Sequence, residues 1–169
     1  MSPTSTPGRR VRTRRLALAA LTTALAVAGV AVGITAAQAA TVGAITGYGG
    51  KCVDVASASS ANGTKIQLWT CNGTNAQQWT VGNADGTVRA LGKCMDVAAA
   101  GTANGTKVQL YDCNGTGSQV WTRGSGGALV NPQSGRCLDA TGPSSDNGTR
   151  LQIWDCTGAA NQQWSAPAA

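Results

Sequence analysis

Residues 137–164 read CLDATGPSSDNGTRLQIWDCTGAANQQW, and two earlier stretches of the chain match this one position by position. Residues 52–79 read CVDVASASSANGTKIQLWTCNGTNAQQW, and residues 94–121 read CMDVAAAGTANGTKVQLYDCNGTGSQVW. No insertion or deletion separates the copies, and the period is 42 and then 43 residues. We call these stretches the first (52–79), second (94–121) and third (137–164) repeats. Such regularity predicts a domain of three equivalent structural units.

The six cysteines occupy the same two positions in every repeat, nineteen residues apart. Six cysteines can pair in fifteen ways. If each unit folds alike, the economical pairing is internal, and each bridge would then contribute about 3 kcal/mol by closing a loop. A metal site does not fit, because the chain has no C-x-x-C spacing and no His. The predicted disulfides are Cys52–Cys71, Cys94–Cys113 and Cys137–Cys156.

The composition and the local patterns predict an all-β fold. Helix formers are scarce, while the 23 Gly and the scattered Val, Thr and Trp favour strands and turns. In the first repeat Val53 and Val55 flank Asp54, so on a strand the two valines face the core and the carboxylate faces away. An Asn-Gly-Thr follows eight residues after this Asp in all three repeats and predicts a tight turn. The next strand carries Gln67 and Trp69 on the outward face.

The first 39 residues predict a secretory signal peptide that is removed, which leaves residues 40–169 as the mature domain. Five arginines between Arg9 and Arg15 precede an uncharged apolar run, Leu16–Ile34, and Ala37-Gln38-Ala39 offers a signal peptidase site. The alternative is a membrane anchor, since this run could just span a bilayer. We expect export, which agrees with six cysteines in one domain.

Removal of the signal changes the charge of the protein. The mature part keeps eight Lys or Arg against seven Asp, a net charge near +1. No basic patch remains that would bind nucleic acid or a membrane surface. The whole chain also lacks His and Glu. With every Cys paired, no Ser/His, Cys/His or metal cluster is available for catalysis.

At these residues the chain resembles the ricin B-type lectins, also known as R-type lectins or family-thirteen carbohydrate-binding modules. The shared pattern is C-[VML]-D…NGT…Q-[LI]-[WY]-x-C…Q-x-W, three times over, from about Ile45 to Trp164. The resemblance implies a β-trefoil of twelve strands, four per repeat. It also implies that the Q-x-W tryptophans, Trp79, Trp121 and Trp164, are core residues.

The resemblance further implies a shallow sugar pocket on each repeat. An Asp accepts hydrogen bonds from two hydroxyls, an aromatic stacks on the sugar ring, and a Gln and an Asn-Gln pair complete or support the site. In this chain these positions are Asp139, Gln152, Trp154, Asn161 and Gln162 in the third repeat, Asp54, Gln67, Trp69 and Gln77 in the first, and Asp96, Gln109, Tyr111 and Gln119 in the second. Ala76 and Ser118 stand where the third repeat has its Asn, so we expect the third site to bind most strongly.

The residue types suit a sugar without reference to any family. A carboxylate accepts charge-assisted hydrogen bonds from neighbouring hydroxyls, and a flat aromatic covers the C–H face of a pyranose. Two alternatives remain: the aromatics could pack over the neighbouring disulfides, and the Asp residues could cap turns.

The sequence therefore predicts a secreted, monomeric lectin that binds galactose-, xylose- or related sugar units without catalysis, cofactor or metal. Glycoside hydrolysis usually needs two carboxyl groups in one site, whereas each repeat offers one equivalent Asp. The alternative function is a β-trefoil protease inhibitor or another protein-binding module. Its only candidate binding loop is the Gly-rich connector 122–136.

Overall fold

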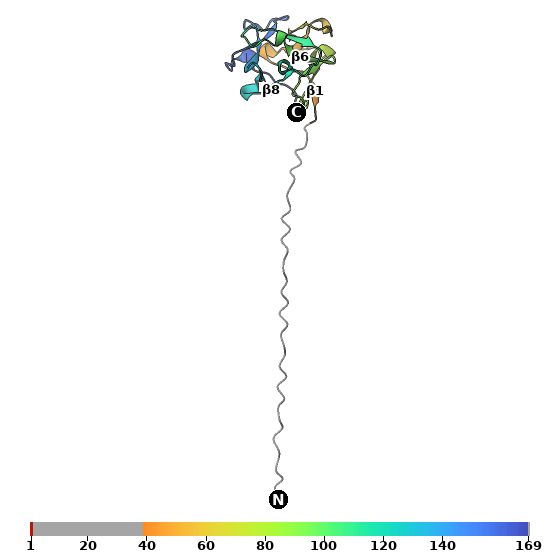
Figure 1. The fold of residues 1–169 in the computed structure, drawn as a ribbon, viewed down its shortest axis with the longest axis vertical. Coiled ribbons are helices and arrows are strands. Elements are labelled where there is room, and N and C mark those ends of the chain that lie inside the picture. Colours follow the sequence, from red (N-terminus) through yellow and green to blue (C-terminus); the bar gives the residue numbers. More distant parts are fainter. Residues whose placement is uncertain (2–38, 169) are drawn as a thin grey trace. The chain divides into compact units, whose positions relative to one another are not determined.

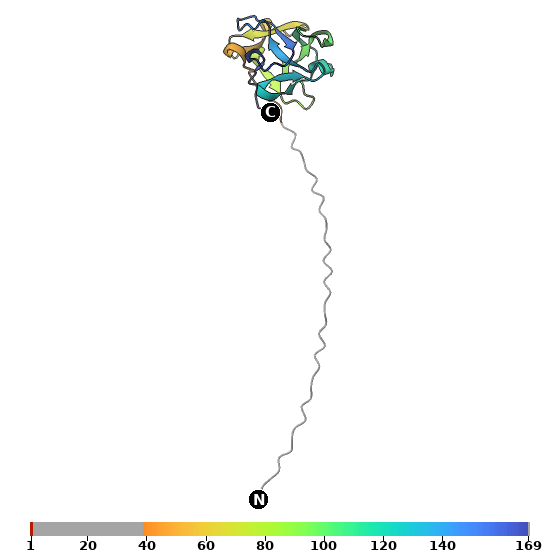
Figure 2. The ribbon, with the colours of Figure 1, turned by 90° about the vertical axis from the view of Figure 1, so that its left-hand side faces the viewer.

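The computed structural model describes Met1 and residues 39–168, and the proposed signal peptide therefore lies almost entirely outside the described residues. Residues 39–168 form short strands joined by turns and single 3-10 turns (Figures 1 and 2). The strands are β1 Thr41–Gly43, β2 Cys52–Val55, β3 Thr64–Trp69, β4 Trp79–Val81, β5 Arg89–Ala90, β6 Lys93–Val97, β7 Val108–Tyr111, β8 Thr122–Arg123, β9 Leu129–Asn131, β10 Arg136–Ala140 and β11 Leu151–Trp154. The 3-10 turns are η1 Tyr48–Gly50, η2 Ala56–Ala58, η3 Asn75–Gln77, η4 Ala98–Ala100, η5 Gly117–Gln119, η6 Ser125–Gly127 and η7 Ala160–Gln162.

Each repeat contributes one antiparallel hairpin in the same register. The hairpins are β2–β3, β6–β7 and β10–β11, and each aligns the Asp of one strand with the Gln of the other. The predicted Asn-Gly turns form, because Gly63, Gly105 and Gly148 adopt φ values of 85°, 85° and 90°, which only glycine adopts without strain. The alternation read from the sequence therefore holds in all three repeats.

The three repeats pair with one another at two separate levels of the fold, and at each level the pairing links all three. Near the hairpin tips β3 pairs with β7, and bridges Lys107↔Gln152 and Gln67↔Arg150 link both strands to β11. At the other level β4 pairs with β5 and β8 with β9, while Thr46 and Ser165 exchange two backbone hydrogen bonds of 2.9 and 2.7 Å. Each repeat thus pairs with both others, which is the β-trefoil arrangement.

Two of the twelve expected strands are reduced to isolated bridges. The positions of Thr46 and Ser165 correspond to the first and last strands of the trefoil, and the other ten are β2 to β11. Pro167 follows the last position and cannot donate a ladder hydrogen bond. An additional strand, β1, pairs with β4 and lies beside the C-terminal end of the described chain, where Thr41 Oγ1 donates to Ala168 O at 2.7 Å (Figure 1).

Aliphatic side chains from all three repeats form one core. The three Q-x-W tryptophans are buried as expected, and each indole N–H donates to the carbonyl of the residue after the first Cys of its repeat. These bonds run from Trp79 to Val53, from Trp121 to Met95 and from Trp164 to Leu138, at 2.8, 3.0 and 3.0 Å. Each tryptophan therefore anchors the strand that carries the Asp.

The three disulfides pair within repeats, as the sequence predicts: Cys52–Cys71, Cys94–Cys113 and Cys137–Cys156.

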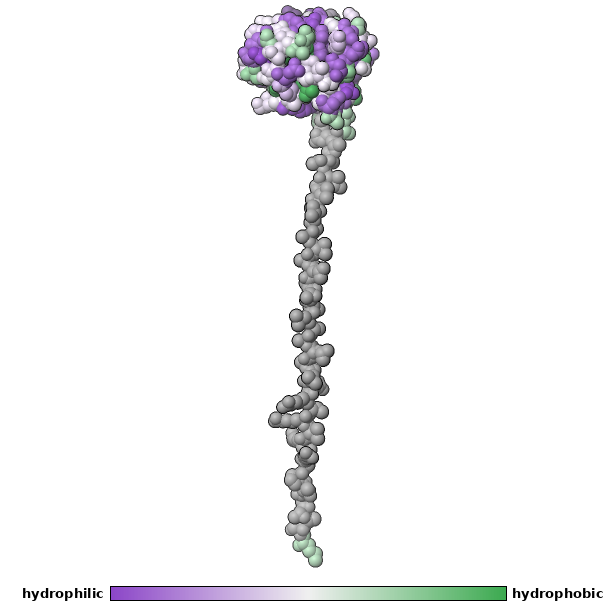
Figure 3. All heavy atoms as spheres, viewed as in Figure 1, coloured by the Kyte–Doolittle hydropathy of each residue, from purple (hydrophilic) through white to green (hydrophobic). Residues whose placement is uncertain are grey.

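The face of residues 39–168 shown in Figure 3 is mostly hydrophilic or neutral, with small isolated apolar areas. Within the described part of the chain, no helix has the length and hydropathy needed to cross a bilayer.

Candidate functional site

The three Asp residues lie at the bottom of outward-facing hollows, where neighbouring amides hold them. In the third repeat Gln152, directly opposite on β11, donates to Asp139 Oδ1 at 3.0 Å. Gln67 and Gln109 donate in the same way to Asp54 and Asp96, at 2.9 and 3.0 Å. Each Asp is only 5% exposed. The carboxylates therefore point away from the apolar core yet are buried under polar neighbours, which fixes their orientation.

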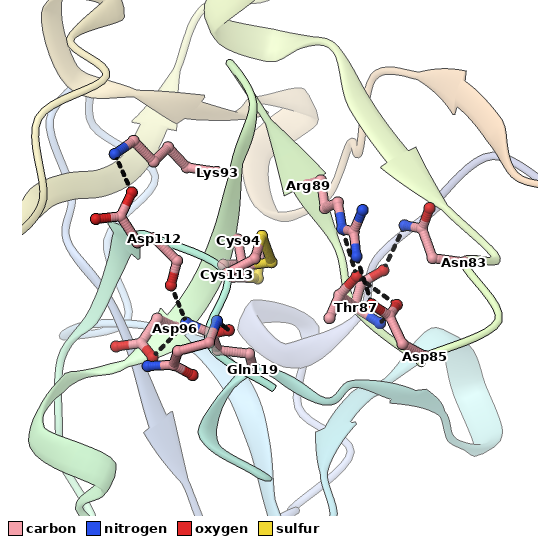
Figure 4. Close-up of a disulfide and its surroundings, with 12 residues drawn as sticks. Asn83, Asp85, Thr87, Arg89, Lys93, Cys94, Asp96, Asp112, Cys113 and Gln119 are labelled. Atoms are coloured by element: carbon pink, nitrogen blue, oxygen red, sulfur yellow. Dashed lines mark hydrogen bonds and ion pairs between the residues drawn. A yellow bond between two sulfur atoms is a disulfide. The ribbon is translucent and has the colours of Figure 1, made fainter. Parts of the chain in front are cut away.

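The Gln of each Q-x-W motif holds the Asp and the loop after the second Cys together. Gln162 Nε2 donates to Asp139 Oδ2 at 3.0 Å and to Asp155 O at 2.9 Å, and its oxygen accepts the N–H of Thr157 at 2.8 Å. Figure 4 shows the same arrangement in the second repeat, where Gln119 bridges Asp96 and Asp112. The first repeat repeats it with Gln77. These glutamines are buried, so they position the site from behind.

The residue before this Gln differs among the repeats, and so does the third contact to the carboxylate. Asn161 donates to Asp139 Oδ2 at 2.7 Å, and Ser118 donates to Asp96 Oδ2 at 3.1 Å. Ala76 has no donor, so Asp54 receives two side-chain hydrogen bonds while the other two Asp residues receive three. Ser118 thus supplies the third hydrogen bond to its Asp, as Asn161 does in the third repeat.

The three predicted stacking aromatics are the exposed ones. Trp69, Tyr111 and Trp154 are 39%, 38% and 41% exposed. Each stands opposite the first Cys of its repeat in the hairpin register, so the disulfide lies beside the ring but leaves much of it open to solvent. Each ring therefore lies opposite a disulfide cysteine and still presents an exposed surface to a ligand.

The hollows have different sizes. The cavity of the third repeat has a volume of about 540 Å³, that of the first about 480 Å³ and that of the second about 280 Å³. Each is lined by the predicted Asp, the hairpin Gln and the aromatic of its own repeat. A hollow of about 610 Å³ also lies around Gly47 and Trp164, but none of its described lining residues is charged.

The wall opposite the aromatic comes from the loop after the Asp strand, which sequence reasoning did not single out. In the first two repeats this wall contains Ser57 and Ala58, and Ala99 and Ala100, all with φ between 51° and 56°. L-residues adopt this region at a cost of about 1–2 kcal/mol each. The third repeat has Gly142-Pro143 instead. The walls therefore differ in shape while the hairpins stay alike.

A second feature missed in the sequence is a clamp between neighbouring repeats. The Asn of each Asn-Gly-Thr turn binds the residue before the second Cys of another repeat. Asn62 bonds with Asp112 at 2.6 and 2.9 Å, Asn104 with Asp155 at 2.7 and 2.9 Å, and Asn147 with Thr70 at 2.8 and 3.1 Å. The Lys93 ammonium and the Asn62 amide lower the pKa of the Asp112 carboxyl below its ordinary value of 3.8. Asp112 and Asp155 therefore stabilise repeat contacts.

Comparisons with known proteins agree with this geometry. The model of the ricin-type beta-trefoil lectin domain matches residues 41–164. Among solved structures, the agglutinin of Abrus precatorius is 32% identical with a TM-score of 0.72, over 79% of this chain and 50% of that chain. The chain thus spans half the length of that agglutinin. No curated protein sequence matches the chain.

Two further structures are similar. The designed threefold-symmetric protein ThreeFoil is 30% identical with a TM-score of 0.67, over 73% of this chain and 95% of that chain. A non-toxic homologue of type II RIPs from Momordica charantia (bitter gourd), solved in complex with α-methyl-D-galactoside, is 30% identical with a TM-score of 0.68, over 76% of this chain and 48% of that chain. The family model spans all three repeats, because its match runs from residue 41 to residue 164.

Proposed function

Because the chain belongs to the ricin-type β-trefoil lectin domain family, we propose that it is a secreted carbohydrate-binding protein with three sugar sites and no catalytic activity. The observation that carries the proposal is the threefold occurrence of one pocket in which a carboxylate, a glutamine and an exposed aromatic converge. In the third repeat these are Asp139, Gln152 and Trp154.

The pocket suits the two kinds of surface that a pyranose presents. The exposed Trp154 ring offers an apolar face for the C–H side of the sugar. Asp139 is fixed by three amide donors and keeps acceptor capacity for hydroxyls, because a carboxylate has about four lone-pair sites. Since the carboxylate is already oriented, little ordering is required when the sugar binds.

We further propose that the sites differ in strength, in the order third, first, second. The third repeat has the complete residue set and the largest of the three cavities. The first has a Trp platform but Ala76 in place of the Asn. The second has the smaller Tyr platform and the smallest cavity. Both the residue types and the cavity volumes support this order.

The carboxylate count argues against glycoside hydrolysis. Of the described residues that line each cavity, one is a carboxylate. The usual hydrolytic mechanism needs two carboxyl groups about 5–10 Å apart. The carboxylates next to the second Cys, Asp112 and Asp155, are engaged in the clamps between repeats. Binding without chemistry is thus the function that the geometry supports.

A galactose-type sugar is the first ligand to test, because a solved neighbour 30% identical to this chain holds α-methyl-D-galactoside. The experiment is a glycan array with residues 40–169, followed by calorimetry on the best ligands. We expect binding to galactose- or xylose-containing glycans and its reduction in Trp154→Ala. Absence of any glycan binding, together with inhibition of a protease, would favour the protein-binding alternative. Glycan hydrolysis by the purified protein would contradict the non-catalytic assignment.

A further inference from the structure

We infer that the first-repeat cavity accepts an acidic sugar, a pyranose with a carboxylate or sulfate group. The inference rests on the proposed lectin function and names the ligand class of one of its sites. It derives from Lys65, which lines the first cavity together with Asp54, Gln67 and Trp69. In the other two cavities, the Asp is the one charged residue among the described lining residues.

The three repeats have a cation at equivalent positions, two residues before the hairpin Gln: Lys65, Lys107 and Arg150. On a strand, residues two apart share a face, so these cations lie on the same outward side as the glutamines and aromatics. Their surroundings nevertheless differ. Lys107 Nζ leaves its own repeat and donates to Gln152 Oε1 at 2.9 Å, and Arg150 lies opposite Gln67. Neither lines the cavity of its own repeat.

Lys65 Nζ also bonds to another repeat, but to a backbone carbonyl at the hairpin tip of the third repeat. Its Nζ donates to Gly148 O at 3.3 Å, and Gly148 N donates to Leu68 O at 2.8 Å. The ammonium therefore lies at the hairpin tip of the third repeat, where that tip pairs with Leu68, and Lys65 and Trp69 both line the first cavity.

The surroundings of the hairpin-tip glycines give a second, independent indication of where the Lys65 ammonium lies. A Cβ at Gly105 would meet the Trp154 ring and Gln152 Oε1 of the third site at 3.8 and 3.9 Å. A Cβ at the equivalent Gly148 would meet Lys65 Nζ at 3.9 Å. In the first repeat the ammonium thus occupies the space that borders the platform and the glutamine.

This arrangement separates the two charges of the first site. Asp54 lies opposite Gln67 at the bottom of the cavity and can accept hydrogen bonds from sugar hydroxyls, whereas the Lys65 ammonium lies at its edge and has donors beyond the one given to Gly148. An anionic substituent on a stacked sugar could then receive a charge-assisted hydrogen bond. Because the ammonium is partly exposed, we expect a preference of about fivefold for the acidic sugar, reduced at high salt.

The test uses the variant Tyr111→Ala/Trp154→Ala, which retains only the first platform. Calorimetry compares two matched pairs of methyl glycosides, galactoside with galacturonoside and xyloside with glucuronoside, and adds galactose 6-sulfate to separate carboxylate from sulfate. We expect the acidic member of at least one pair, or the sulfate, to bind about fivefold more tightly than its neutral partner. Lys65→Gln should abolish this preference, because it removes the positive charge from the cavity.

Lys93→Gln is the charge-matched control, since Lys93 lies outside the lining of the three cavities and pairs with Asp112. It should keep the preference. Equal binding of acidic and neutral sugars, or a preference that survives in Lys65→Gln, would overturn the inference while the lectin function stands. If the unmodified protein binds neither neutral nor acidic glycans, the proposed function itself fails.

Discussion

Asn104 of the second repeat and Asp155 of the third are joined by two hydrogen bonds: Asn104 Nδ2 donates to Asp155 Oδ2 at 2.7 Å, and Asp155 N donates to Asn104 Oδ1 at 2.9 Å. The bonds cross the boundary between repeats at the tip of an Asn-Gly turn. They show that this turn residue, besides favouring the hairpin, connects neighbouring repeats.

We therefore predict that Asn104→Ala lowers the free energy of unfolding by about 1–3 kcal/mol, since it removes three hydrogen bonds, two with Asp155 and one from Arg136 Nε, and leaves polar groups without their partner. Chemical denaturation measures the change. Asn75→Ala, which alters an exposed asparagine, serves as the control and should change stability by less than about 0.5 kcal/mol. Equal effects of the two substitutions would show that the clamp contributes nothing specific.

The two tryptophans of the third repeat should have opposite phenotypes. Trp164 is buried and bonded to Leu138, so Trp164→Ala should destabilise the fold by about 3–5 kcal/mol. Trp154 is exposed, so Trp154→Ala should leave the Tm nearly unchanged and abolish sugar binding at the third site. Thermal unfolding and calorimetry distinguish these outcomes, and exchanged phenotypes would show that platform and core are misassigned.

Valency should appear as a difference between monosaccharide and polymer. One shallow site should bind a monosaccharide at roughly millimolar to tens of micromolar Kd. Three sites on one domain should bind the polymer about a hundredfold more tightly, because later contacts become intramolecular. Trp154→Ala should reduce monosaccharide binding most, while Trp69→Ala and Tyr111→Ala should each weaken polymer binding as well. Similar affinities for monomer and polymer would argue against trivalent binding.

The aromatics are better probes of the sites than the carboxylates. Asp139 accepts hydrogen bonds from three buried or half-buried amides, so Asp139→Ala would leave these donors unpaired and destabilise the protein as well as the site. A loss of binding in that variant therefore has to be compared with its Tm.

The contribution of Asp112 to stability should depend on pH in a defined direction. Lys93 and Asn62 lower its pKa in the folded state, so the unfolded state binds the proton more readily. The stabilisation is therefore fully present above the ordinary pKa of 3.8 and is lost as pH falls through the lower folded value. The Tm difference between the unmodified protein and Asp112→Asn should be constant near neutral pH and shrink below about pH 4. A difference that grows on acidification would contradict this assignment.

The export proposal predicts the N-terminus of the mature protein. Cleavage after Ala37-Gln38-Ala39 leaves Ala40 as the first residue. Intact-mass analysis of protein collected from the culture medium should show residues 40–169 with three disulfides. Protein that remains membrane-bound with its first 39 residues would support the anchor alternative.

Much of the fold could be predicted from the sequence because the same residue pattern occurs three times in equivalent surroundings. The period placed every Cys with its partner, and the alternation around Asp54, Asp96 and Asp139 assigned inward and outward faces correctly. These features depend on a hairpin and its own disulfide, which are local. The expectation of twelve strands was less accurate, since the strand positions of Thr46 and Ser165 form only isolated bridges, and the bridge between them depends on pairing between the two ends of the domain.

What only the tertiary structure decided lies where one repeat meets another. Lys65 and Lys107 occupy equivalent positions in the sequence, yet Lys107 bonds to Gln152 of the next lobe and Lys65 lines its own cavity. Likewise, the sequence alone shows Asp155 beside a cysteine, and only the folded ring brings Asn104 to it. The physical reason is that alternation along a strand determines which face of the strand a side chain takes. Its hydrogen-bond partners, in contrast, come from segments more than forty residues away, which meet only when the three repeats pack together.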